Sequence, residues 1–172
     1  MSTPTWALTL AYWFHMLATV VWIGGLSTLA LLILPMSQRS LNEEAFSVQL
    51  EGIQSRLDIL GWFSLAVLTG TGLVQMSGNP NYEGLLEFGN LWSAAILLKH
   101  IVFGGMIVVS AYLTWGLIPR LRRTVLYQAR LQPGSRQEEL TPILRTNRRL
   151  VYLNLSLAVI VLAFTAAARA LN

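Results

Sequence analysis

The chain has 172 residues, of which 54% are hydrophobic and only 12% are charged, against roughly 25% charged residues in an average soluble domain. A soluble globule with so few charges would lack the polar residues that cover its surface. The chain contains no cysteine, which excludes a disulfide-stapled secreted module and a cysteine-based zinc site. Composition therefore indicates a single domain whose solvent is the lipid bilayer.

Four apolar runs are long enough to cross the roughly 30 Å hydrocarbon core of a bilayer. They cover about residues 6–34, 57–76, 91–118 and 150–168, and Asp58 lies at the start of the second. Each span must be helical, because a segment in lipid has to satisfy its own backbone hydrogen bonds. We therefore expect an all-α integral membrane four-helix bundle, with residues 1–172 as a single four-span domain. The first run lacks the basic flank and cleavage site of a signal peptide and is expected to be a span.

Short motifs between the spans predict where helices begin. Ser40 followed by Glu43 forms a capping box, and Thr141 followed by proline is typical of a helix N-terminus. Both motifs predict helices that continue into the second and fourth spans. Between the second and third spans, residues 78–81 predict a turn and Asn90 predicts an N-cap.

Basic residues are concentrated in two of the connections. The connections 36–56 and 119–149 contain ten of the twelve Lys and Arg residues, whereas 78–90 contains none. The positive-inside rule places both basic connections in the cytoplasm and both termini outside, as in a multi-pass protein of the bacterial inner (plasma) membrane. The expected partner is the lipid bilayer and not nucleic acid, because the cluster is not interleaved with aromatic residues. The ten residues are Arg39, Arg56, Arg120, Arg122, Arg123, Arg130, Arg136, Arg145, Arg148 and Arg149.

The two halves of the chain resemble each other. His15 precedes Pro35 by twenty residues, and His100 precedes Pro119 by nineteen. The second and fourth spans share the tetrapeptide Ser-Leu-Ala-Val. This similarity predicts two pseudo-repeated helical hairpins related by an axis along the membrane normal.

The only two histidines, His15 and His100, lie inside the first and third spans. Each is about nine residues from the expected outer start of its span, which places both imidazoles roughly 13 Å below the outer edge. Polar side chains at such depth favour a functional site, and two imidazoles at one level suit bis-His ligation of haem b. We predict both histidines as metal ligands, with Gly104 leaving room beside His100 and Trp22 lining the pocket or stacking on the ring.

Lys99 is the only basic residue deep inside a span. An uncompensated charge there costs roughly 2.5–3.5 kcal/mol even on the lenient insertion scale. Its ammonium group either reaches up to the outer interface or pairs with a buried anion such as a haem propionate. The candidate cofactor-binding residues are therefore His15, His100, Lys99, Trp22 and Gly104.

The haem interpretation predicts a membrane b-type cytochrome. Six-coordinate iron has no open position, so electron transfer with a quinol or another redox protein is expected, and any enzyme would be an oxidoreductase or a redox subunit. Two alternatives stay open from the residues alone: copper binding, and a cofactor-free structural subunit whose histidines only donate interhelical hydrogen bonds. Copper(I) favours soft ligands, yet neither Met16 nor Met106 shares the face of the adjacent histidine. Self-association also stays open.

Several short motifs resemble those of a known family. They are His15, the segment Val21-Trp-Ile-Gly-Gly-Leu26, the segment Leu68-Thr-Gly-Thr-Gly72, the segment Leu97-Leu-Lys99, and the segment Ile118-Pro-Arg-Leu121. Over about residues 6–125 the chain resembles the copper resistance protein D (CopD) membrane domain, and more distantly the HemJ-type protoporphyrinogen oxidases. The resemblance implies a four-helix unit that handles copper or b-type haem, with His15, Trp22, Gly24, Gly25 and Lys99 as site residues.

The chain also departs from both patterns. No Met-rich or His-rich entrance and no external copper-collecting domain is present in the sequence, which argues against a role in copper import. The spacing between Trp22 and Pro35 differs from that of the HemJ-type proteins, which argues against protoporphyrinogen oxidation. A copper transporter and a HemJ-like oxidase are therefore alternatives to the cytochrome.

Overall fold

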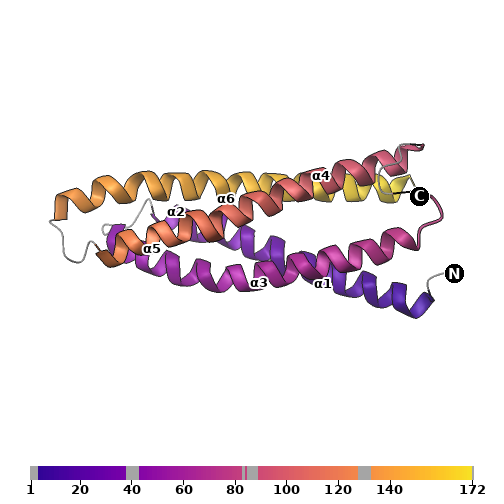
Figure 1. The fold of residues 1–172 in the computed structure, drawn as a ribbon, viewed down its shortest axis with the longest axis horizontal. Helices are drawn as coiled ribbons and strands as arrows, with labels where there is room; N and C mark the ends of the chain where they lie inside the picture. The colour runs from indigo at the N-terminus through magenta and orange to yellow at the C-terminus, as the bar shows by residue number, and fades with distance from the viewer. Residues whose placement is uncertain (1–3, 38–42, 83, 85–88, 128–132, 172) are drawn as a thin grey trace.

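Four long helical segments lie side by side along one axis, and both termini lie at the same end (Figure 1). The computed structural model describes residues 4–37, 43–82, 84, 89–127 and 133–171. The first segment comprises α1 (Thr5–Thr28), the π-helical turn η1 (Leu29–Ile33) and α2 (Leu34–Ser37), and the second is α3 (Glu43–Ser77). The third comprises α4 (Leu91–Ala111), the π-helical turn η2 (Tyr112–Leu117) and α5 (Ile118–Tyr127), and the fourth is α6 (Pro133–Ala170).

Each segment contains a stretch long and apolar enough to cross a membrane. The described residues form helices and turns without any strand, which confirms the expected all-α membrane bundle. The helices extend beyond the apolar runs at the end of the bundle opposite the termini, so the spans are longer than the sequence predicted. The four spans are Thr5–Met36, Val48–Ser77, Leu91–Thr124 and Glu138–Ala170.

Of the three predicted helix starts, one is confirmed, one lies outside the described residues and one is wrong. The Asn90 side chain accepts a hydrogen bond from the Ser93 N–H at 2.7 Å, which confirms the N-cap of α4. The capping-box residue Ser40 lies outside the described residues, and α3 is described from Glu43 onward. The start predicted at Thr141 is wrong, because α6 begins at Pro133 and carries Pro142 inside it. The helix continues past this proline on an exposed face.

A π-helical turn precedes a proline in both the first and the third segment. The turn η1 ends just before Leu34 and Pro35, and η2 ends just before Ile118 and Pro119. A proline cannot donate a backbone hydrogen bond, and its ring crowds the carbonyl four residues earlier, so the preceding turn widens. The same irregularity at the same place in each half supports the predicted pair of repeated hairpins.

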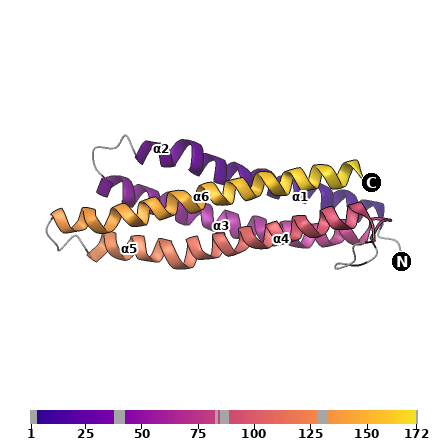
Figure 2. The same cartoon turned by 90° about the horizontal axis from the view of Figure 1, so that it is seen from above.

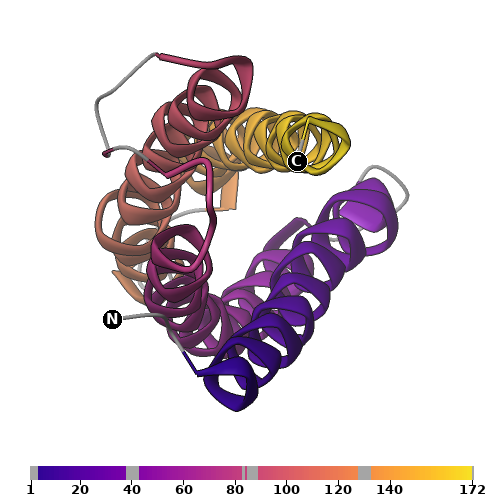
Figure 3. The same cartoon turned by 90° about the vertical axis from the view of Figure 1, so that its right-hand side faces the viewer.

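The helices pair as two hairpins. In Figures 1 and 2, α1 lies along α3, and α4 lies along α6. Figure 3, which looks along the bundle from the end with both termini, shows the same pairing. The hairpins meet mainly where α3 packs on α5 and where α6 packs on α1 and η1. One core cluster at this junction contains Leu29, Ala30, Leu34, Phe46, Leu50, Leu113, Leu117 and Val151.

Polar side chains join the two hairpins inside the bundle. Gln54 of α3 and Asn147 of α6 are 3% and 1% exposed, and their amides exchange two hydrogen bonds of 3.1 Å. The Tyr152 hydroxyl of α6 donates to the Ala30 carbonyl of η1 at 3.0 Å. This oxygen lies five residues before Pro35, which has no N–H to offer it. Both interactions fix the hairpins in register, because a buried polar group without its partner is costly.

The amide pair provides a test of this junction. Replacing Asn147 with Ala should destabilise the bundle by about 1–2 kcal/mol, because Gln54 is left buried without a partner. The double variant Gln54→Leu, Asn147→Leu should be close to the wild type, because both polar groups are removed together. Thermal unfolding in detergent measures the difference. The interpretation would be contradicted if the stability lost by the double variant equals the sum of the losses of the two single variants, one at Gln54 and one at Asn147.

The orientation in the membrane stays a prediction. The turn around Pro80 lies at the same end as both termini, and the arginine-rich start of α5 lies at the other. Since the chain has no cysteine, single-cysteine variants report the topology directly. Pro80→Cys should react with a membrane-impermeant maleimide in intact spheroplasts, and Arg123→Cys should react only after permeabilisation. The reverse pattern would show that the termini are cytoplasmic.

Candidate functional site

His15 is held by a hydrogen-bond relay that defines its tautomer. Its Nδ1 lies 2.8 Å from Oγ1 of Thr71 on α3. The Thr71 hydroxyl lies 2.6 Å from the Val67 carbonyl, which can only accept, so the hydroxyl proton is used there. The Nδ1–H of His15 must therefore donate to Thr71, and Nε2 keeps a free lone pair. This is the form in which a neutral imidazole binds a metal ion.

His100 is also oriented by a hydrogen bond at Nδ1, but the acceptor is a backbone carbonyl of its own helix. Its Nδ1 lies 2.7 Å from the Ile96 carbonyl one turn earlier in α4. Because a carbonyl only accepts, Nδ1 carries the proton, and Nε2 is the nitrogen with a lone pair when the ring is neutral. Both histidines are partly buried. Each therefore offers one unprotonated nitrogen inside a membrane span.

Trp22 of α1 contacts Phe103 of α4 edge-on, with ring centroids 6.1 Å apart, so the two helices that contain the histidines also contact each other through aromatic rings. His15 follows the first residue of α1 by ten positions, and His100 follows the first residue of α4 by nine. The equal depth of the two imidazoles in the membrane stays a prediction.

The predicted haem site is not supported. In the part of the chain that the structure describes, there is no histidine pair arranged for haem and no cluster of three or more metal-binding side chains. Below the histidines, the space between the hairpins is filled by a core cluster around Trp22 and Met106. The cavity beside that cluster measures about 70 Å³, far below the roughly 300–1,000 Å³ typical of cofactor pockets. Bis-His haem ligation and electron transfer to a quinol therefore have no basis in this geometry.

The other predicted site residues have distinct surroundings. Lys99 is partly buried and close enough to His15 for its charge to act on the imidazole. Among the described residues it forms no ion pair with a carboxylate. A Cβ added at Gly104 would meet no atom within 4 Å, as is also true of Gly105. The role of Gly104 beside His100 stays a prediction.

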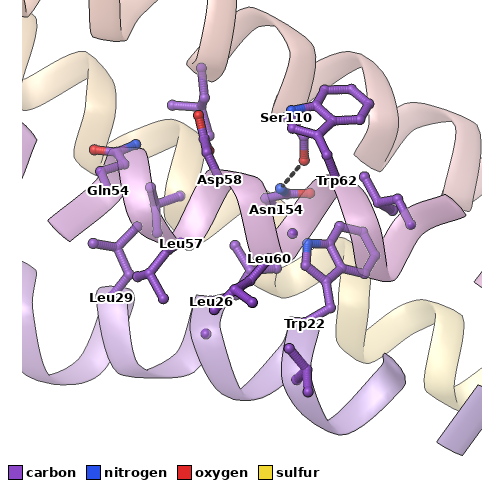
Figure 4. Close-up of a pocket in the computed structure, with 16 residues that line it drawn as sticks. Trp22, Leu26, Leu29, Gln54, Leu57, Asp58, Leu60, Trp62, Ser110 and Asn154 are labelled. Carbon is purple, nitrogen blue, oxygen red and sulfur yellow. Dashed lines mark hydrogen bonds between the residues drawn. The ribbon is translucent and has the colours of Figure 1, made fainter. Parts of the chain in front are cut away.

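Trp22 forms one wall of the interior cavity. It is 7% exposed, and a Cβ at Gly61 of α3 would lie only 3.7 Å from its indole. Figure 4 shows Trp22, Leu26 and Leu29 of α1 on one side of the cavity, with polar side chains from the other helices across from them. This cavity is below the histidines, so the predicted role of Trp22 in a pocket beside His15 stays a prediction.

The polar side chains of this cavity come from three helices. Gln54 and Asp58 belong to α3, Ser110 to α4 and Asn154 to α6. Asn154 donates from Nδ2 to Ser110 Oγ at 2.9 Å. Sequence reasoning noted only Asp58. The missed signal was the spacing of Asn147 and Asn154, which are seven residues apart and so share one face of a span that should be apolar.

Asp58 is tied to the opposite hairpin. Its carboxylate accepts a hydrogen bond from the Thr114 hydroxyl of η2. The Thr114 oxygen in turn accepts from the Trp62 indole N–H at 3.2 Å. This chain of bonds holds the carboxylate against the third segment of the bundle.

Fold and site together define a small polytopic membrane protein with imidazoles near one end and a polar cavity further inside. The sequence matches the family of copper resistance protein D (CopD) over residues 52–168. The chain therefore belongs to the CopD family, as its motifs indicated. The match includes Lys99, His100 and Gly104, whereas His15 and Trp22 lie outside it. Comparisons with curated proteins and with solved structures found no match.

The tautomer of His15 is directly testable. Replacing Thr71 with Val removes the acceptor of the Nδ1 proton, so the imidazole should populate both tautomers. Nitrogen-15 NMR of histidine-labelled protein distinguishes the protonated from the unprotonated ring nitrogens. Thr69→Val is the matched control, because Thr69 bonds only to the Leu65 carbonyl of its own helix and is exposed. An unchanged His15 spectrum in Thr71→Val would contradict the relay.

Proposed function

We propose that this protein binds copper ions as its cargo and conducts them through the four-helix bundle. The observation that carries the proposal is the match to copper resistance protein D over residues 52–168. That match covers most of α3 and the whole of α4 to α5, together with nearly all of α6. A copper-handling function agrees with the multi-pass membrane structure and requires no cofactor-sized pocket.

His15 is the first ligand in this proposal. Imidazole nitrogen is a ligand that suits copper, and the bond to Thr71 fixes the ring with Nε2 unprotonated. His100 of α4 offers a second Nε2. Two imidazoles on different helices of the bundle suit successive positions of a moving ion.

Lys99 adjusts the strength of copper binding. Its ammonium group acts on His15 through space, so a copper ion on that imidazole meets a like charge. Conduction needs binding that is strong enough to admit the ion and weak enough to release it. We infer that the lysine keeps the first position weak.

Copper transport tests the proposal. In proteoliposomes, His15→Ala should lower copper uptake about tenfold or more, because even changes beside a metal ligand reduce affinity by that amount. His100→Ala should lower uptake as well. Elemental analysis of the vesicles measures the metal. Met16→Leu is the matched control, because Met16 adjoins His15 in sequence but is 59% exposed on the lipid-facing side.

Two results would contradict the proposal. One is copper uptake that is unchanged in both histidine variants and equal to that of empty vesicles. The other is a purified protein whose absorption spectrum shows a haem that His15→Ala removes. The second result would restore the cytochrome interpretation.

A further inference from the structure

The interior cavity has a composition that the copper route does not explain. It lies between α1, α3, α4 and α6, below both histidines, and measures about 70 Å³ (Figure 4). Its lining residues include one acidic side chain, Asp58, and no basic one. The cavity therefore has one carboxyl group and no cationic side chain inside the bundle.

Asn154 adds an unused hydrogen-bond acceptor to this cavity. Its side chain is 1% exposed, and its Nδ2 is bonded to Ser110. Its Oδ1 is buried and has no hydrogen-bond partner in the described part of the chain. Such acceptors are rare in folded proteins, and a water molecule or an ion often completes their bonding.

Asp58 lacks a positively charged partner. In the described ranges, the ion pair found is that of Glu51 with Arg122, at 3.9 Å and away from the cavity. Asp58 itself receives a hydrogen bond from Thr114 but no cation. Ionisable groups inside membrane spans are normally paired, since an isolated charge is expensive there.

We propose that this cavity is a binding site for a single alkali-metal cation, of which sodium is the one to test. Asp58 supplies the carboxylate and Asn154 Oδ1 the carbonyl oxygen, both hard ligands that suit such ions. The single negative charge is balanced by a single positive charge. The indoles of Trp22 and Trp62, which also line the cavity, add electron-rich surfaces that favour a cation.

Size and ligand chemistry both separate this site from the copper route. A water molecule occupies about 30 Å³ in the liquid, so a cavity of about 70 Å³ has room for a small ion with one water. Copper(I) prefers sulfur and nitrogen ligands, and the cavity lining offers neither methionine nor histidine. The inference goes beyond the proposed copper transport and does not depend on it.

The test uses the full-length protein in lipid nanodiscs. Sodium chloride replaces choline chloride at constant ionic strength while tryptophan fluorescence is recorded, because two of the six tryptophans line the cavity. The wild type should show a saturable change and a rise in Tm with sodium. Asp58→Asn should weaken sodium binding about tenfold or more, a loss as large as that seen at metal sites when a supporting group is removed. Asn154→Leu should weaken it too and serves if Asp58→Asn does not fold.

Glu51→Gln is the matched control. It removes the same charge from the same helix, two turns away, and should bind sodium as the wild type does. His15→Ala should also keep the sodium response, which separates failure of this site from failure of the copper proposal. The inference is overturned if sodium has no more effect than choline. It is equally overturned if Asp58→Asn responds like the wild type, or if copper(I) produces the Asp58-dependent change and sodium does not.

Discussion

The need to satisfy every polar group without water governs this structure. In the hydrocarbon region a backbone or side-chain polar atom has only the protein to bind. The reciprocal amide bonds of Gln54 and Asn147 and the bond from Tyr152 to Ala30 meet this need across the junction of the hairpins. The apolar packing of α1 on α3, and of α4 on α6, would by itself leave the two hairpins free to slide.

The same constraint makes the few polar atoms with unused bonding capacity informative. His15 and His100 each use one ring nitrogen for a protein bond and leave the other unprotonated. Asp58 and Asn154 each have a partner but also an oxygen with capacity to spare. Ser93 Oγ is another buried atom without a hydrogen-bond partner among the described residues, so bonding capacity is left over at a few separate places in the bundle.

Features that depend on local sequence were predictable. The four spans follow from the thickness of the bilayer. Asn90 caps α4 through a hydrogen bond with a residue only three positions further along the chain. The family could be recognised from the sequence for the same reason, because its motifs are short and continuous. Thr141 failed as a helix start since a helix can continue through a proline near an exposed end, where one lost hydrogen bond is replaced by water.

Features that depend on how helices align were not predictable. The contact of Trp22 with Phe103 joins α1 to α4, and the span boundaries say nothing about it. The cavity brings single polar residues from three helices together, and each alone is an unremarkable residue in a long apolar run.

The π-helical turns show how two similar halves acquire different tasks. In η1 the residue five places before the proline is Ala30, whose carbonyl joins the hairpins through Tyr152. The corresponding residue in η2 is Thr114, whose hydroxyl holds Asp58. One backbone irregularity, present in both copies, therefore bonds to the other hairpin through a backbone carbonyl in the first and through a side-chain hydroxyl in the second. The residue at a single equivalent position thus makes the two halves differ in how they are joined.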